Sequence, residues 1–113
     1  MKIDEADPAI ESALKILQAH IARPISGREL SRKVGFAESY LIRLFKKNIG
    51  MPPMKYLTKI RIESAQYLLT SSPLTVNAVA EQSGYRDEFH FSKAFKKFTG
   101  LPPSAYRESR HTV

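Results

Sequence analysis

The sequence contains no cysteine among its 113 residues. Disulfide bonds, cysteine-ligated zinc and thiol catalysis are therefore excluded, and this composition fits a cytosolic protein. Long apolar runs are missing too, because no stretch approaches the roughly 20 consecutive apolar residues that span a bilayer. The first residues, MKIDEADPAI, carry acids where a secretion signal needs basic and then apolar residues. We therefore expect neither secretion nor a membrane partner.

Signs of catalysis are equally sparse. No glycine-rich phosphate-binding loop and no recognisable nucleophile–base spacing occurs in the chain. Asp87, Glu88 and His90 lie close together in the sequence, but no second cluster completes a metal or acid–base site. The sequence therefore predicts no enzyme, no metal site and no cofactor.

Positive charge, in contrast, is in excess. The 18 Lys+Arg residues outnumber the 11 Asp+Glu residues and give a net charge of +7. Such an excess on a small chain attracts polyanions but says little about the fold. The positions of the charges matter more than their sum.

The spacing of apolar residues is helical nearly throughout, and runs of alternating β-branched residues are absent. Asp7 is placed to cap a first helix that begins at Pro8, and Ser26 and Thr75 are placed to cap two short helices that end near Gly35 and Gly84. In a longer helix at about 53–71, the expected core positions are Tyr56, Leu57, Ile60, Ala65, Leu68 and Leu69. The sequence therefore predicts an all-α fold of about seven helices.

A basic, aromatic phrase occurs twice in the chain. FKKNIGMPP at 45–53 and FKKFTGLPP at 95–103 lie fifty residues apart, and each is followed by a tyrosine, Tyr56 or Tyr106. Each copy closes a unit made of a short capped helix, a glycine turn and a second helix. That order is typical of a helix-turn-helix motif.

The second helix of each unit has an apolar face and a polar-basic face. Both copies place cations at the third and fourth outward positions, and no acid follows the first turn. The expected inward residues are Leu41, Leu44, Phe45 and Asn48, and Phe91, Ala94, Phe95 and Phe98; the outward residues are Ser39, Ile42, Arg43 and Lys46, and Phe89, Ser92, Lys93 and Lys96.

These residues carry a resemblance to a known family. GYRDEFHFSKAFKKFTGLPPSAYR, from Gly84 to Arg107, closely resembles the signature of the AraC/XylS family of bacterial transcription regulators. ELSRKVGFAESYLIRLFKKNIGMPPMKYL resembles the first helix-turn-helix of that family. Glycine-to-phenylalanine spacings of ten (Gly35 to Phe45) and eleven (Gly84 to Phe95) agree with it as well.

The resemblance implies a DNA-binding domain at 8–107, with subdomains at about 8–52 and 73–107 joined by a connecting helix at about 53–71. Each second helix is expected to enter a major groove of double-stranded DNA. A 19-residue helix rises roughly 28 Å, near the 34 Å repeat of grooves on one face of the duplex. One monomer would then substitute for a dimer, and its site would be asymmetric because the two readers differ.

The outward side chains divide by their chemistry. Arg43 is the strongest candidate for reading guanine, and Lys93 is its counterpart. Ile42 and Phe89 depart from the polar residues often found there in the family, and each either contacts thymine methyls or covers the subdomain edge. Glu88 either accepts from cytosine or only suits the helix start. The expected base readers are thus Ser39, Ile42, Arg43, Glu88, Phe89, Ser92 and Lys93; the expected phosphate contacts are Ser26, Lys46, Lys47, Thr75, Lys96 and Lys97.

The resemblance also implies RNA polymerase as a partner of an activator, and a cytoplasmic, nucleoid-associated location. A helical protein-interaction adaptor is the alternative function, with Lys59, Arg61 and Glu63 on the outward face of the connecting helix. Loss of DNA binding with salt would favour the regulator. The chain is expected to be either a stand-alone regulator or the DNA-binding part of a longer protein.

Overall fold

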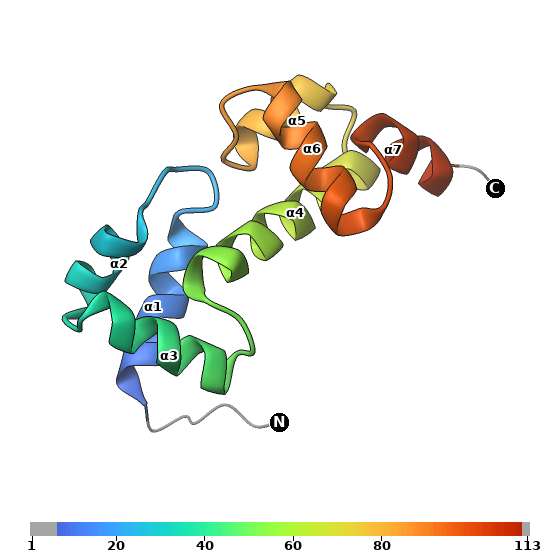
Figure 1. Cartoon of the computed structure of the whole chain (residues 1–113). Coiled ribbons are helices and arrows are strands. Elements are labelled where there is room, and N and C mark those ends of the chain that lie inside the picture. Colours follow the sequence, from blue (N-terminus) through green and yellow to red (C-terminus); the bar gives the residue numbers. More distant parts are fainter. Residues whose placement is uncertain (1–6, 112–113) are drawn as a thin grey trace. The chain divides into compact units, whose positions relative to one another are not determined.

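The structure, a computed structural model, describes residues 7–111. That range holds seven α-helices and no strand (Figure 1). The helices are α1 (Pro8–Ala19), α2 (Gly27–Val34), α3 (Glu38–Asn48), α4 (Pro53–Ser71), α5 (Val76–Gln82), α6 (Glu88–Thr99) and α7 (Pro103–His111). The predicted all-α fold is confirmed. Within the same range, no helix is long and apolar enough to cross a membrane. The acidic residues that precede Asp7, and residues 112–113, lie outside the described range.

The predicted caps start the helices. The side chain of Asp7 accepts from the Ala9 N–H at 3.0 Å, that of Ser26 from Glu29 at 3.0 Å, and that of Thr75 from Ala78 at 3.1 Å. Each bond satisfies an amide that the first turn leaves without a helical partner. Gly35 ends α2 with φ 91°, a left-handed conformation that glycine adopts without steric cost.

The chain divides after Thr58 into two compact units. In the first unit, α1, α2 and α3 pack on one another around Ile10, Leu17, Leu30, Leu41 and Phe45, each with at most 1% of its surface exposed. Leu41 and Phe45 lie four residues apart and therefore on one face of α3. This burial fixes which face of α3 is left for solvent.

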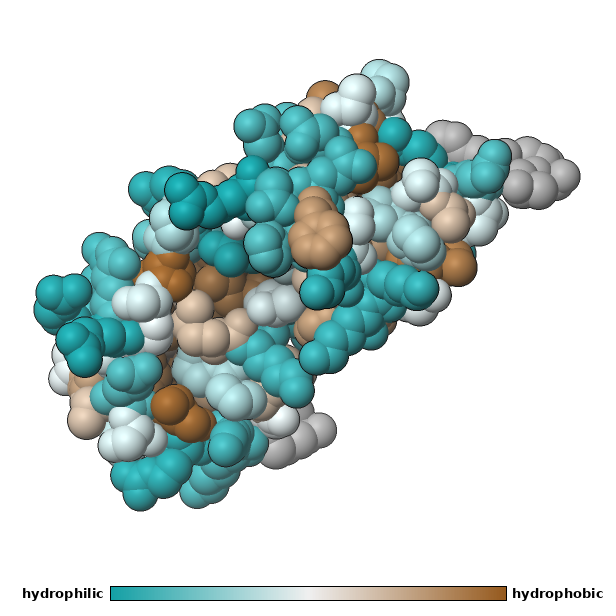
Figure 2. All heavy atoms as spheres, turned by 45° about the horizontal axis from the view of Figure 1, so that its top comes forward, coloured by the Kyte–Doolittle hydropathy of each residue, from teal (hydrophilic) through white to brown (hydrophobic). Residues whose placement is uncertain are grey.

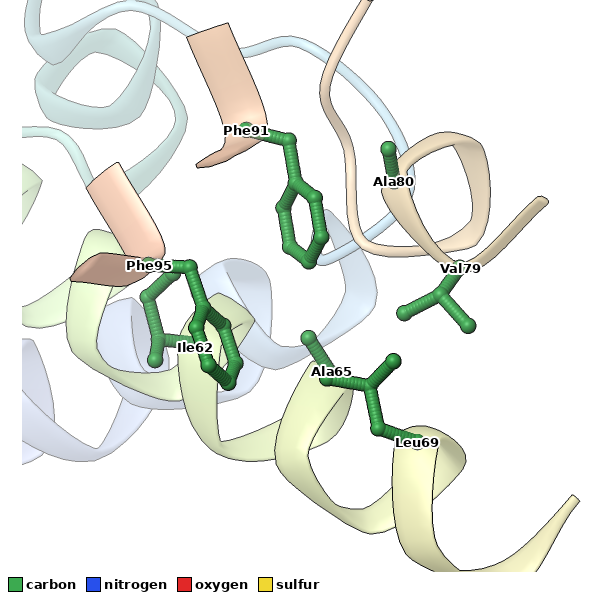
Figure 3. Close-up of a cluster of buried hydrophobic side chains, with 7 residues drawn as sticks. All are labelled: Ile62, Ala65, Leu69, Val79, Ala80, Phe91 and Phe95. Atoms are coloured by element: carbon green, nitrogen blue, oxygen red, sulfur yellow. The ribbon is translucent and has the colours of Figure 1, made fainter. Parts of the chain in front are cut away.

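The second unit repeats this arrangement around α6. Phe91 and Phe95 are fully buried against Ile62, Ala65 and Leu69 of α4, together with Val79 and Ala80 of α5 (Figure 3). The rings of Phe91 and Phe95 are 5.6 Å apart. The opposite face of α6 is again the one that remains exposed.

The repeated phrase has a direct structural meaning. Its phenylalanine and the tyrosine eleven residues later form an edge-on ring pair in each unit: Phe45–Tyr56 at 6.3 Å and 62°, and Phe95–Tyr106 at 5.2 Å and 77°. Such geometry is favourable for aromatic rings beyond the area they bury. The phrase therefore encodes the joint between each second helix and the helix that follows it.

Arg107 of α7 forms two hydrogen bonds with backbone carbonyls at the end of α4. Its Nε donates to the carbonyl of Leu69 at 2.8 Å and its Nη2 to that of Ser72 at 3.3 Å. The last carbonyls of a helix have no helical partner, so this guanidinium caps the C-terminal end of α4. It ties α7 to α4 within the unit.

One core prediction was wrong, and one core residue was missed. Phe98, expected to face inward, is 42% exposed, because it lies in the last turn of α6 beside a surface hollow shared with Ile62 and Gln66. Ile62, not expected in the core, is 2% exposed. The first turns of α4 belong to one unit and the rest to the other, so the buried face changes along the helix.

Candidate nucleic-acid interface

The solvent side of α3 carries most of the residues predicted to contact DNA in the first unit. Ser39, Arg43, Lys46 and Lys47 are exposed. Ile42 is half-buried and lines an apolar hollow of about 210 Å³ with Leu41 and Met54 among others. For Ile42, therefore, part of the side chain covers its own unit.

The solvent side of α6 is the counterpart. Glu88, Phe89, Lys93, Lys96 and Lys97 are exposed, whereas Ser92 is half-buried. Phe89 is 67% exposed, a large share for so apolar a side chain. Figure 2 shows hydrophilic side chains covering much of the face in view, with some hydrophobic ones among them. Each second helix thus presents cations to solvent, whereas Phe45 on α3 and Phe91 and Phe95 on α6 face the core.

The start of α6 is held by an aspartate–histidine pair. The Asp87 carboxylate accepts from the His90 backbone N–H at 2.8 Å, and Oδ2 lies 2.9 Å from Nδ1 of the His90 ring. The bonds from the backbone and then the ring of His90 hold the pKa of Asp87 below its ordinary value. Two of the three residues in that cluster of the sequence, Asp87 and His90, therefore form a helix cap. Across residues 7–111, no group of three or more potential metal ligands occurs.

This pair predicts a pH dependence. Because the folded-state pKa of Asp87 is lowered, its charge stabilises the fold fully above the ordinary aspartate pKa of about 3.9. That contribution is lost as the pH falls through the folded-state pKa. Asp87→Asn keeps a capping oxygen without the charge, so its melting temperature should be below that of the unmodified chain at neutral pH. The gap should close on acidification. Thermal unfolding from pH 7 to pH 2 measures it, and a gap independent of pH would contradict the assignment.

The two residues expected to contact phosphate at helix starts, Ser26 and Thr75, are both exposed, but a carboxylate already lies beside the start of α2. Ser26 and Thr75 are exposed, and each hydroxyl already accepts a capping bond. At the first residue of α2, a Cβ built on Gly27 would lie 2.6 Å from Oε2 of Glu38. A carboxylate therefore already lies beside the α2 N-terminus, where it is favoured by the helix dipole and competes with an incoming phosphate.

The face of α4 considered for a protein adaptor is partly engaged within the chain. Lys59 Nζ and Glu63 Oε2 form an ion pair at 3.0 Å. Arg61 is half-buried, and burial lowers the pKa of its guanidinium, although the nearby Tyr85 offsets this in part. Burial likewise raises the pKa of the Tyr85 hydroxyl. These residues thus contribute to the second unit itself.

The sequence interpretation missed two aromatic residues: Tyr40 beside Arg43, and Phe36 beside Tyr40. Phe36 and Tyr40 are 44% and 38% exposed, and their rings are 5.3 Å apart. Their spacing of four residues, followed by Arg43 three residues later, was the available signal.

Two units, each with a glycine-ended helix, a tight turn and a second helix with a cationic outer face, define a class: DNA-binding proteins with paired helix-turn-helix motifs. A family described as "Helix-turn-helix domain" matches residues 30–109. The chain belongs to this family, in its AraC-type form.

Individual relatives agree with this assignment. The C-terminal domain of AraT, a response regulator from Geobacillus stearothermophilus, is 32% identical and has a TM-score of 0.91, covering 97% of this chain and 92% of that one. The DNA-binding domain of AdpA, a global transcriptional factor solved in complex with a target DNA, is 27% identical with a TM-score of 0.84, covering 92% and 93%.

A third relative is a longer protein. The raffinose operon transcriptional regulatory protein RafR of Pediococcus pentosaceus is 39% identical over 97 residues, which are 86% of this chain and 35% of that protein. The chain spans between 27% and 38% of the length of four curated relatives that it matches.

Proposed function

We propose that α3 and α6 are the two recognition helices of a transcription regulator and that they enter successive major grooves of one asymmetric DNA site. The observation that carries the proposal is the same cation pattern on the exposed side of both helices: Arg43, Lys46 and Lys47 on α3, and Lys93, Lys96 and Lys97 on α6. Burial of Phe45 and Phe95 orients each pattern toward solvent. The domain is proposed to run from 8 to 107.

Within this proposal the side chains have separate roles. Arg43 and Lys93 read bases, and Ser39, Ser92 and the Glu88 carboxylate contact base edges near them. Phe89 is exposed enough to contact a thymine methyl, whereas half-buried Ile42 offers only part of its side chain. The four remaining lysines of the two helices, with Ser26 and Thr75, contact phosphates and set position without reading sequence.

The wider setting follows from the same proposal. One chain binds as a monomer in the cytoplasm, because two different readers in one polypeptide need no symmetric partner. RNA polymerase is the proposed protein partner, and no catalytic step is assigned. A pure adaptor would instead show no DNA affinity at low salt, whereas DNA binding that weakens steeply with salt supports the regulator.

A matched pair of substitutions tests the division of roles. Arg43→Ala should cost on the order of 1–3 kcal/mol and relax preference at one base pair, because a bidentate contact to guanine is lost. Lys97→Ala should weaken binding to all sequences alike and lower the salt slope by roughly one. Titrations of both variants against the preferred site, its single-base variants and random DNA measure the difference. A loss of Arg43→Ala affinity that is uniform over all these DNAs would refute base reading by Arg43.

A further inference from the structure

We propose that each base-reading cation is positioned by an aromatic ring one helical turn before it: Tyr40 positions Arg43 on α3, and Phe89 positions Lys93 on α6. This inference rests on the proposed function, since it concerns how the same two helices read DNA. It assigns Tyr40 a role in specificity and gives Phe89 a role besides contact with DNA.

At the start of α3, Tyr40 contacts Arg43 on the same helix and Phe36 in the turn before it. The Arg43 guanidinium carbon lies 5.9 Å from the centre of the Tyr40 ring, within the range of a cation–π contact. The Tyr40 ring in turn lies 5.3 Å from that of Phe36, with 32° between their planes. The Tyr40 ring therefore contacts both the Phe36 ring and the Arg43 guanidinium.

On α6 a cation also lies over an aromatic ring, but the two residues are four positions apart and not three. The Lys93 ammonium lies 5.2 Å from the centre of the Phe89 ring. The stack spans four residues here and three residues on α3, and both spacings bring side chains together on one side of a helix. At the fifty-residue offset Phe89 corresponds to Ser39, not to Tyr40. The repeated phrase therefore does not explain the stacks, yet both units place a ring beside the cation proposed to read bases.

An arginine stacked on an aromatic ring can still donate hydrogen bonds to a base. When an arginine stacks on an aromatic ring, the ring faces the flat side of the guanidinium, and the N–H groups that meet guanine O6 and N7 point outward in its plane. A long side chain held in this way has already lost part of the rotamer freedom that binding would remove. The expected benefit is therefore preference for one base pair, without any added charge.

The test combines substitutions of Tyr40 with Arg43→Ala. Tyr40→Leu removes the aromatic face and should lower preference at the base pair read by Arg43 by about two- to five-fold, with an unchanged salt slope. Tyr40→Phe keeps the ring and should retain that preference. In the Arg43→Ala background, Tyr40→Leu should have no further effect on base preference. The measurement is the ratio of Kd values for the preferred site and its single-base variants.

The outcomes separate this inference from the proposed function. If Arg43→Ala relaxes base preference but Tyr40→Leu does not, only the positioning role is overturned. An equal effect of Tyr40→Leu with and without Arg43 would mean that Tyr40 acts directly on DNA, which also overturns it. If Arg43→Ala changes no base preference, both proposals fail. Should Tyr40→Leu unfold, Phe36→Leu provides the second variant, with a smaller loss of preference expected at the same base pair.

Discussion

Phe95→Ala is expected to lower the free energy of unfolding by about 3–5 kcal/mol, the usual cost of removing a buried phenylalanine ring. Phe95 is fully buried beside Phe91 (Figure 3), and its ring lies 5.6 Å from that of Phe91. It also lies 5.2 Å from the ring of Tyr106. Units of this size bury little surface and hold only a small excess of stability. The loss should therefore leave α6 without a fixed position, and sequence-specific DNA binding should be lost with it. Urea unfolding followed by far-UV circular dichroism measures the first effect.

Phe98→Ala is the matched control, because it removes the same ring from the same helix three residues later. Phe98 is 42% exposed, so its replacement should cost clearly less than that of Phe95. Equal losses for the two variants would contradict the assignment of Phe95 to the core and Phe98 to the surface.

Replacing Lys46, Lys47, Lys96 and Lys97 with glutamine is expected to abolish most of the salt dependence of DNA binding. Each phosphate contact contributes about 0.9 to the slope of log K against log salt, so the slope should fall by about 3.6. At 0.1 M salt the affinity should fall on the order of 10³-fold, and by similar factors for preferred and random DNA. Titrations at four or five salt concentrations give both quantities.

A second quadruple variant controls for net charge. Lys15, Arg23, Lys55 and Arg110 lie outside α3 and α6, and their replacement by glutamine also lowers the net charge from +7 to +3. This variant should change the slope by no more than about one. Equal slopes for the two variants would show that total charge, and not its position on the two helices, drives binding.

Local chemistry made much of the fold predictable. Asp7, Ser26 and Thr75 were identified as caps because capping depends on a residue and the amides two or three positions later. The inward faces of α3 and α6 followed from the spacing of Leu41 and Phe45 and of Phe91 and Phe95. Both signals lie within one or two turns of helix, where sequence distance and spatial distance agree.

The features that the sequence did not predict depend on how neighbouring helices and side chains pack. Periodicity gives the direction of Phe98 on α6, but not how far α4 extends to cover it. Ile62 was missed because the buried face of α4 changes between units. The Tyr40–Arg43 stack depends on side-chain rotamers, which spacing permits but does not determine. The roles of the exposed residues on α3 and α6 remain predictions.

The central claim is that two unlike helices of one chain read one DNA site. Selection of bound sequences from a pool of random duplexes, with the purified chain, tests it most directly. We predict two dissimilar blocks of preferred bases, with centres about 10 base pairs apart, one helical turn of B-DNA. Arg43→Ala should blur a position in one block, and Lys93→Ala a position in the other. An inverted repeat of a single block, or one block alone, would contradict the account.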